Sequence, residues 1–343
     1  MLKPKTFSVI LSLFLFIAAS CEKKSEQPVV KEIPESRKQV TELNEIVNPG
    51  EQIEKVTEGI EFDTAATPLY ADGELYFTNT NFDSPKKCRT MKIDKFGKLH
   101  ILREKNGLTS SIQHSGRGTF YCCEMLGHRI IEMDREGKVL RVAAGEYNGK
   151  RIDGPNDLTI DSKDGIYFTD SQYIAGREKM QETPAVYYVK SDGTVIRVID
   201  DIDFPNGIEL SPDEKTLYIA NTRGKTKGRY VRAYDVLEDG TVTNGRDFAE
   251  IQLTDEEVGK PDGASGADGT AVDSAGNLYV ATTKGLSVQV FNSSGKHLGN
   301  IECPSVSNNM TFGGEDMKTL YISAKSGIYK IRVKIPGFRV PKG

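Results

Sequence analysis

The sequence lacks the features that mark several classes of protein. Its 343 residues carry a formal net charge of −4 and no basic stripe, which argues against nucleic acid as a partner. No Cys-x-x-Cys motif occurs, and the four histidines, His100, His114, His128 and His297, do not have the spacing of metal ligands. No stretch has the apolar periodicity of a long helix. We therefore expect an all-β globular protein whose histidines are surface or structural residues.

The sequence contains a short motif that occurs six times, each time with a tyrosine at the same position. Residues 73–77 read Gly-Glu-Leu-Tyr-Phe, and residues 276–280 read Gly-Asn-Leu-Tyr-Val. A period of roughly 40–50 residues is typical of a solenoid, propeller or array. A continuous repeat indicates one domain, because each repeat needs its neighbours to bury its faces. The six tyrosines are Tyr76, Tyr121, Tyr167, Tyr218, Tyr279 and Tyr321.

One repeat, residues 155–199, shows what each unit folds into. Polar and apolar residues alternate in its short segments, as they do in strands. Glycine turns at 163–165 and 191–193 separate these segments. Four antiparallel strands per repeat form a propeller blade. The predicted strands are 155–161, 166–169, 185–190 and 194–199.

The sixth repeat is one strand short, because only a proline-bearing tail follows residues 328–333. Residues 52–56, ahead of the first repeat, are able to supply the missing strand. That pairing would join the two ends of the domain in one blade and leave no long free edge. The predicted fold is a six-bladed β-propeller over residues 51–343, closed by an N-terminal strand.

The first residues have the pattern of an export signal. A basic start with Lys3 and Lys5 precedes an apolar run, Phe7–Ala19, which is too short to span a bilayer comfortably. Small residues stand directly before Cys21, as in a bacterial lipoprotein signal over residues 1–20, with Cys21 as the lipidated residue. The alternative is an ordinary secretory signal in which Cys21 has no role. Residues 21–50 are polar and charged and predict a flexible tether.

This interpretation predicts a lipoprotein of the cell envelope, on the periplasmic face of a bacterial outer membrane. We expect a monomer whose membrane contact is through Cys21 only. Export permits disulfides, but the spacing of Cys88, Cys122, Cys123 and Cys303 does not say which would pair. Cys122 and Cys123 are neighbours on a predicted strand, so one of them is expected to face the core.

The tyrosines also locate the residues that would line the central channel. The innermost strand of each blade precedes the tyrosine strand, and its start lies 10–12 residues before the tyrosine. That count reaches Asn or Asp in four blades, namely Asn156, Asn206, Asp268 and Asn309. Their oxygens suit Ca²⁺, which takes several oxygen ligands in flexible geometry. The alternative is that these residues are simply turn formers at strand starts.

Several of these stretches also carry a family resemblance. They resemble the family that includes gluconolactonase, senescence marker protein and luciferin-regenerating enzyme, over residues 66 to 337 and in the same order. The similar stretches are Gly154-Pro155-Asn156-Asp157 with 164–170, Pro205-Asn206-Gly207, Asp268-Gly269 with 276–279, and Phe312-Gly313-Gly314 with 320–322.

The resemblance implies one divalent cation, commonly Ca²⁺, at the channel mouth, and hydrolysis of lactones or small esters. Asn206 and Asp268 match the family's metal ligands, and Asn156 matches a residue that contacts metal, its water or substrate. Asn309 is a further candidate for substrate binding. The cation would polarise the ring carbonyl, and a carboxylate, Asp268 or Asp157, would accept the proton of water.

Blade one departs from the family pattern. The family has a glutamate ligand there, where this sequence has Ala66. The loss of one formal charge should weaken Ca²⁺ binding, and Glu58, Glu61 and Asp63 are the acidic residues near enough in sequence to replace it. Two smaller departures are Ser110-Ser111 in place of Asn-Gly in blade two, and an arginine shifted to Arg151.

Two functions of different class follow. The first is a metal-dependent hydrolase of sugar lactones or related small esters, anchored in the envelope. The second is a propeller that has lost catalysis and binds a sugar, a peptide or an envelope partner, since fold does not guarantee activity. Substrate specificity would come from loops such as 172–183 and 254–265.

Overall fold

A computed structural model describes residues 42–60, 62–172, 178–224, 229–254, 265–325 and 327–339. These residues belong to one unit that takes in 39–343. The predicted signal, residues 1–20, and Cys21 lie outside the described residues. Within the described ranges, none of the helices has the length and apolar character needed to cross a membrane.

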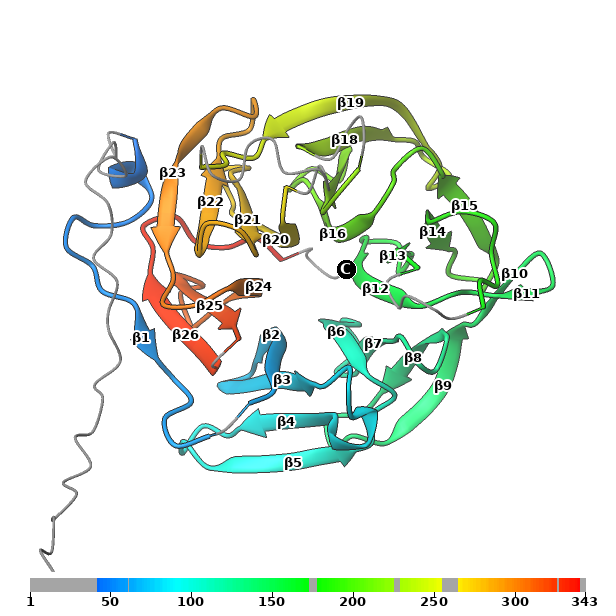
Figure 1. Cartoon of the computed structure of the whole chain (residues 1–343), viewed down its shortest axis with the longest axis horizontal. Coiled ribbons are helices and arrows are strands. Elements are labelled where there is room, and N and C mark those ends of the chain that lie inside the picture. Colours follow the sequence, from blue (N-terminus) through cyan, green and yellow to red (C-terminus); the bar gives the residue numbers. More distant parts are fainter. Residues whose placement is uncertain are drawn as a thin grey trace, which may run out of the picture. The chain divides into compact units, whose positions relative to one another are not determined.

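The described residues form six four-stranded antiparallel sheets arranged as blades around a central axis (Figure 1). In blades 1 to 5 the chain runs from the innermost strand outward, so strands adjacent in sequence are adjacent in the sheet. A short hairpin, β10 (Glu146–Tyr147) and β11 (Lys150–Arg151), links blades 2 and 3.

From the axis outward, the blades consist of the following strands: in blade 1, β2 Thr64–Ala71, β3 Glu74–Thr80, β4 Arg89–Ile93 and β5 Leu99–Glu104; in blade 2, β6 Thr109–His114, β7 Phe120–Glu124, β8 Arg129–Met133 and β9 Val139–Ala144; in blade 3, β12 Pro155–Ile160, β13 Ile166–Asp170, β14 Ala185–Val189 and β15 Val195–Ile199; in blade 4, β16 Pro205–Leu210, β17 Thr216–Asn221, β18 Tyr230–Val236 and β19 Val242–Glu250; in blade 5, β20 Ala267–Val272, β21 Leu278–Thr282, β22 Ser287–Phe291 and β23 His297–Glu302; and in blade 6, β24 Ser307–Gly313, β25 Thr319–Ala324, β26 Gly327–Arg332 and β1 Glu54–Lys55.

The ring closes as the sequence predicts. Strand β1 pairs antiparallel with β26, joining Glu54 to Lys330 and Lys55 to Tyr329, so the start and the end of the domain share blade 6. The all-β six-bladed propeller is therefore confirmed. The only described helices are the one-turn segments η2 (Leu43–Glu45) and η3 (Pro85–Lys87).

The repeated tyrosines lie on the second strand of each blade, where neighbouring blades cover both faces of the sheet. Five of the six are buried, and Tyr321 is partly exposed. The same position explains the cysteines of β7. One of Cys122 and Cys123 was expected to face the core, and both are fully buried because both faces of this strand are covered. The four cysteines in the described part of the chain are unpaired.

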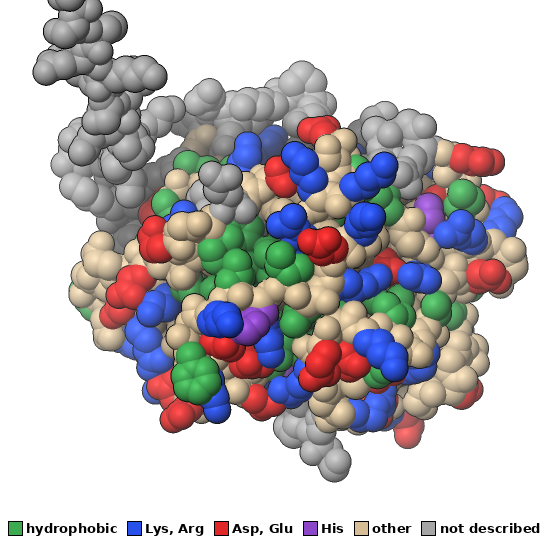
Figure 2. Space-filling view, turned by 90° about the horizontal axis from the view of Figure 1, so that it is seen from below, with side chains coloured by type: hydrophobic (Ala, Val, Ile, Leu, Met, Phe, Trp, Pro, Cys, Tyr) green, Lys and Arg blue, Asp and Glu red, His purple; other side chains and the backbone are tan. Residues whose placement is uncertain are grey.

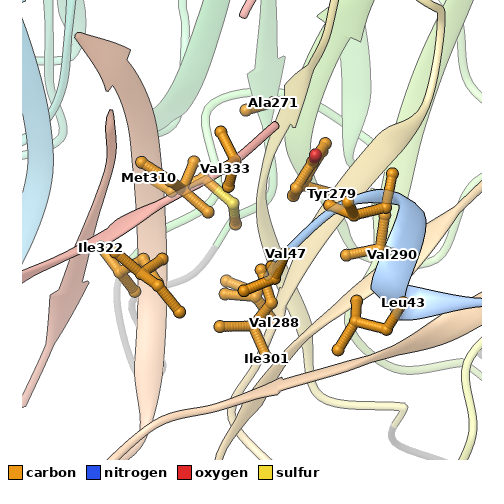
Figure 3. Close-up of a cluster of buried hydrophobic side chains, with 14 of the residues drawn as sticks. Leu43, Val47, Ala271, Tyr279, Val288, Val290, Ile301, Met310, Ile322 and Val333 are labelled. Atoms are coloured by element: carbon orange, nitrogen blue, oxygen red, sulfur yellow. The ribbon is translucent and has the colours of Figure 1, made fainter. Parts of the chain in front are cut away.

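The predicted tether ends earlier than expected. Leu43, Ile46 and Val47, inside the predicted 21–50 tether, are buried against blades 5 and 6 (Figure 3). The side chain of Leu43 lies so close to Gly299 that a β-carbon there would approach it to 2.9 Å. The boundary at Gly50 is thus wrong, because the three apolar side chains at 43, 46 and 47 are buried here, as those of a solvated tether would not be.

The C-terminal segment turns inward under the propeller after blade 6. Phe338 donates its backbone N–H to the carbonyl of Val272, and Gly337 forms a bridge with Asp273. Arg339 donates to the carbonyl oxygens of Tyr70 and Phe312, on blades 1 and 6. This segment therefore covers one end of the central channel, and the opposite end remains the mouth.

The outer rim of blades 1 and 2 carries side chains of mixed character. Figure 2 views this rim, where basic, acidic and apolar side chains are interspersed. β5 and β9 each carry two exposed apolar residues, Leu99 and Ile101 on β5 and Leu140 and Val142 on β9, and ion pairs such as Arg141 with Glu132 lie on the same blades. Charged side chains on the outermost strands discourage pairing with another chain.

Ring closure generates a test of stability. The backbone N–H of Ile328 donates to the Thr57 hydroxyl over 3.0 Å, and Thr57 is fully buried. Thr57→Val keeps the shape but leaves this N–H without an acceptor, which should lower the free energy of unfolding by about 1–3 kcal/mol. Urea unfolding measures the loss, and Thr57→Ser, which keeps the acceptor, is the control. Equal midpoints for the Val and Ser variants would contradict the assignment.

Candidate functional site at the channel mouth

Every innermost strand has an irregularity at its start. Each one carries one extra residue before it enters its regular pairing with the tyrosine strand, for example between Pro155 and Leu158 and between Pro205 and Ile208. A bulge of this kind re-aims side chains and is common beside functional sites. The same shift occurs in all six blades.

The pairing with the tyrosine strand fixes which residues are equivalent among blades. The strand register defines two successive rings around the axis. The mouth ring is Ala66, Ser110, Asn156, Asn206, Asp268 and Asn308, and the second ring is Thr67, Ser111, Asp157, Gly207, Gly269 and Asn309.

The rings place the predicted site residues, with one correction. Asn156, Asn206 and Asp268 share the mouth ring as predicted, but Asn309 belongs one residue deeper, and Asn308 takes its place at the mouth. Counting back from the tyrosine missed this because the turn between the two strands differs in length among blades. The Asn308-Asn309 doublet was the available signal, and only the register decides between its members.

Side chains of the mouth ring are linked across blades 3, 4 and 5. The amide of Asn156 donates to the Asn206 side-chain oxygen over 2.9 Å, and the Asn206 amide donates to the Thr222 hydroxyl over 2.8 Å. Thr222 in turn donates to the carbonyl of Ala267, beside Asp268. The Asn308 amide lies 3.5 Å from a carboxylate oxygen of Asp268. These contacts hold four of the six mouth residues in one network.

The backbone leading into the mouth is held by polar residues at the ends of tyrosine strands. Asp170 accepts hydrogen bonds from the N–H groups of Asp153 and Gly154, and Asn221 accepts one from Phe204. In blade 1, Asn79 accepts from the backbone N–H of Asp63. The Asn79 amide also donates to the Asp63 carboxylate, so Asp63 is engaged there.

The second ring is tightly packed and committed to internal hydrogen bonds. The Asp157 carboxylate accepts from the Ser111 hydroxyl over 2.6 Å, from the Leu158 N–H, and from the Asn309 amide over 3.2 Å. A β-carbon on Gly269 would come within 2.1 Å of Asn309, so this approach requires glycine. Asp157 thus braces the mouth from below, rather than facing solvent as a free proton acceptor.

Both channel aspartates resist ionisation. Burial raises the pKa of Asp157 to about 6, although its hydrogen-bond donors oppose the shift. Burial raises the pKa of Asp268 to about 7, and the negative charge of Asp157 adds to the effect. Asp268 remains partly exposed. A partly exposed carboxylate with a pKa near neutrality is suited to take up a proton or a cation.

A polar cavity of about 50 Å³ continues the channel below the second ring. Its walls include Asp157, Glu209 and Thr270, and its floor includes Arg339. Glu209 accepts from the Thr159 hydroxyl over 2.8 Å, and burial raises the pKa of Glu209 to about 7. Glu209 was not singled out by sequence reasoning, which considered only the starts of the inner strands.

The oxygen atoms of the mouth ring fit a hard cation, although the ring itself carries only one carboxylate. Asn308 presents a buried side-chain oxygen that no described group hydrogen-bonds, beside the Asp268 carboxylate. Oxygen donors of this kind are Ca²⁺ ligands. In the described part of the chain no three acidic, histidine or cysteine side chains gather as a metal site. Blade 1 contributes Ala66 to the mouth ring, where the resemblance led us to expect a glutamate, and Glu61 lies outside the described residues.

Other predicted residues have structural roles. Ser110 donates to the carbonyl of Asn156 over 2.6 Å. Arg151 is exposed on β11 and donates to the carbonyl of Gly127. Each histidine hydrogen-bonds a polar group of the propeller, which is in keeping with the surface or structural role expected for it; His100, for instance, contacts Asp94. Much of the predicted specificity loops, residues 173–177 and 255–264, lies outside the described residues.

Comparison with known proteins identifies the family. Residues 64–326 match the family described as the SMP-30/Gluconolactonase/LRE-like region. The chain belongs to this family. It is 29% identical over 219 residues to a gluconolactonase of Zymomonas mobilis, a match that covers 61% of this chain and 58% of that protein. The match thus spans less than two thirds of that relative's length.

Solved structures share the fold of this family member. A gluconolactonase of Xanthomonas campestris superimposes with a TM-score of 0.72 at 25% identity, covering 85% of this chain and 92% of that one. A calcium-binding protein of Agrobacterium tumefaciens, regucalcin, superimposes with a TM-score of 0.67 at 16% identity, covering 85% and 97%. The propeller resemblance thus spans nearly the whole of both known structures.

The raised pKa of Asp268 predicts how stability depends on pH. A carboxyl whose pKa is higher in the folded than in the unfolded state favours folding at low pH, and this contribution is lost as pH rises through the folded pKa. Without added metal, the protein should lose about 1–3 kcal/mol of stability between about pH 4 and pH 7 from this group.

The Asp268→Asn variant should flatten that dependence. Urea unfolding across pH measures it, with the exposed Asp83→Asn as the matched control. An unchanged slope in Asp268→Asn, equal to that of the control, would show that Asp268 is not the titrating group.

Proposed function

We propose that this protein hydrolyses the ring ester of sugar lactones, with Asp268 at the mouth as the central residue. Three observations support the proposal: the family membership, the gluconolactonases that the chain resembles, and the polar mouth ring. The observation that carries it is that Asn156 and Asn206 lie in the same hydrogen-bonded mouth ring as the partly exposed carboxylate of Asp268.

Each residue has a role in this proposal. Asn156 and Asn206 orient hydroxyl and carbonyl groups of the lactone, since their amides already form the network at the mouth. Asp268 accepts the proton of the attacking water. Asp157 and Asn309 position the mouth from the second ring, which changes the substrate-binding role expected for Asn309.

A bound divalent cation fits the same place, and Ca²⁺ is the best candidate. Asp268, Asn206, Asn308 and Asn156 would hold it through oxygen atoms. It would polarise the lactone carbonyl as a Lewis acid. With one carboxylate in the mouth ring, we infer weaker cation binding than a site with two would show.

One observation favours a second function, a propeller that binds a sugar or another envelope partner without catalysis. Ala66 leaves Asp268 as the single carboxylate of the mouth ring. Loss of a ligand can abolish chemistry while the architecture survives. Activity measurements distinguish the two functions.

We also propose that the mature protein is anchored in the cell envelope through a lipidated Cys21. The basic start, the apolar run and the small residues before Cys21 support this. Several acyl chains on one cysteine would hold the protein stably at a membrane. Mass spectrometry of the N-terminal peptide from membrane fractions tests it, and an unmodified Cys21 would overturn it.

Lactone turnover tests the proposed reaction. The protein should hydrolyse gluconolactone or a related sugar lactone, EDTA should abolish the activity, and Ca²⁺ should restore it. Asp268→Ala should lower kcat/KM by about 100-fold or more, because it removes the proton acceptor and a cation ligand. Asp83→Asn is the matched control. Absence of turnover on every lactone, together with no thermal shift on adding Ca²⁺, would overturn the proposal.

Position 66 offers a gain-of-function test. Ala66→Glu adds a carboxylate to the mouth ring and should tighten Ca²⁺ binding by about 10-fold or more, because affinity rises with ligand charge. Ala66→Gln has the same size without the charge and is the control. Calorimetric titration with Ca²⁺ measures both. Equal affinities for the two variants would show that position 66 does not face the cation.

A further inference from the structure

Two cationic residues follow the tyrosine strands of blades 4 and 5 at equivalent positions. Arg223 and Lys284 each come five residues after the repeated tyrosine of their blade. Arg223 directly follows Thr222, whose hydroxyl accepts from Asn206 and donates to Ala267. Lys284 directly follows Thr283, which is hydrogen-bonded to Gly266, two residues before Asp268. Both cationic residues therefore directly follow threonines that contact the segments leading into the mouth ring.

The Arg223 guanidinium is held in one orientation. Its central carbon lies 4.1 Å from the centre of the Phe204 ring, and Phe204 is buried two residues before Asn206. Stacking of this kind fixes the plane of the guanidinium and leaves its N–H edges available. The side chain is exposed, and no carboxylate in the described part of the chain forms an ion pair with it. The carboxylate of Asp203, which precedes Phe204, lies against Gly224.

The balance of charge at the mouth favours a negative ligand. Asp268 is the single carboxylate of the mouth ring, to which blade 1 contributes Ala66. One carboxylate does not neutralise a divalent cation, so the loaded mouth would keep a positive charge, to which Arg223 and Lys284 add. A cleft lined by one sign of charge concentrates ligands of the opposite sign.

We propose that the substrate is a lactone that carries an anionic group, a carboxylate or a phosphate, outside its ring, and that Arg223 binds this group. The inference rests on the proposed lactonase function and names its substrate class. A stacked guanidinium offers two parallel N–H donors to two oxygens of a carboxylate or phosphate, which gives both strength and orientation. Arg223 is thus a specificity-determining residue, separate from the groups at the reacting carbonyl.

The test compares three lactones: neutral gluconolactone, glucarolactone with a free carboxylate, and a phosphorylated gluconolactone. In the unmodified protein kcat/KM should be higher for at least one anionic lactone than for the neutral one. The anionic lactone with the higher kcat/KM shows whether the site recognises a carboxylate or a phosphate. Arg223→Gln should lower kcat/KM for that lactone by about 10- to 100-fold and change the neutral one less than about twofold. The kcat/KM of Arg223→Lys should lie between those of the unmodified protein and Arg223→Gln, since a lysine keeps the charge but lacks the two parallel N–H donors. Arg151→Gln, an exposed arginine of β11, is the control.

The outcomes separate this inference from the proposed function. If the neutral lactone is hydrolysed best and Arg223→Gln changes all three rates equally, the inference is wrong and the lactonase function stands. If no lactone is hydrolysed, the lactonase function fails. Calorimetric titration with the open-chain acids, glucarate and phosphorylated gluconate, then tests whether Arg223 binds an anionic group. Binding that Arg223→Gln abolishes supports an anion site; no binding, or equal binding by the variant, overturns it.

Discussion

The extra residue at the start of every inner strand is the constraint on which the site depends. A regular ladder would alternate these side chains between the two faces of each blade, whereas the bulge turns two successive residues toward the axis. Six blades repeat this device, and two polar rings result. The mouth ring includes the partly exposed Asn156 and Asp268 and holds the candidate chemistry. The polar side chains of the second ring hydrogen-bond one another, and these bonds hold the mouth ring in position.

The two aspartates show how this layering assigns different roles to the same residue type. Asp157 accepts hydrogen bonds from Ser111 and Asn309 of the second ring and from the backbone N–H of Leu158, and a glycine at 269 lets Asn309 approach closely. Asp268, one layer outward, has a weaker set of donors and remains partly exposed. Burial raises the pKa of both, but only Asp268 has both the access and the unfilled hydrogen-bonding capacity that binding a cation or accepting a proton requires.

The presence of Ala66 at the mouth, where the resemblance leads us to expect a glutamate, has two consequences. It removes one formal charge from the ligands available to a cation, and it makes the mouth more positive toward a substrate. Arg223, stacked on Phe204, and Lys284 act in the same direction. The proposed weaker cation site and the proposed preference for anionic lactones would therefore both follow from the absence of that carboxylate. The far end of the channel, covered by the segment around Arg339, leaves the mouth as the route of access.

The sequence by itself determined the fold, because a repeat with a fixed tyrosine leaves few architectures, and it found Asn156, Asn206 and Asp268. It misassigned Asn309 and ended the tether too late at Gly50. Hairpin turns of unequal length move the count by one or two residues, and only the strand register shows that Asn308 is the mouth residue. Burial of Leu43, Ile46 and Val47 likewise depends on a surface that blades 5 and 6 build together. The pKa values of Asp157 and Asp268, and the stacking that orients Arg223, depend on contacts between strands about 20 to 150 residues apart. Tertiary packing alone brings those groups together, so no local pattern could have specified them.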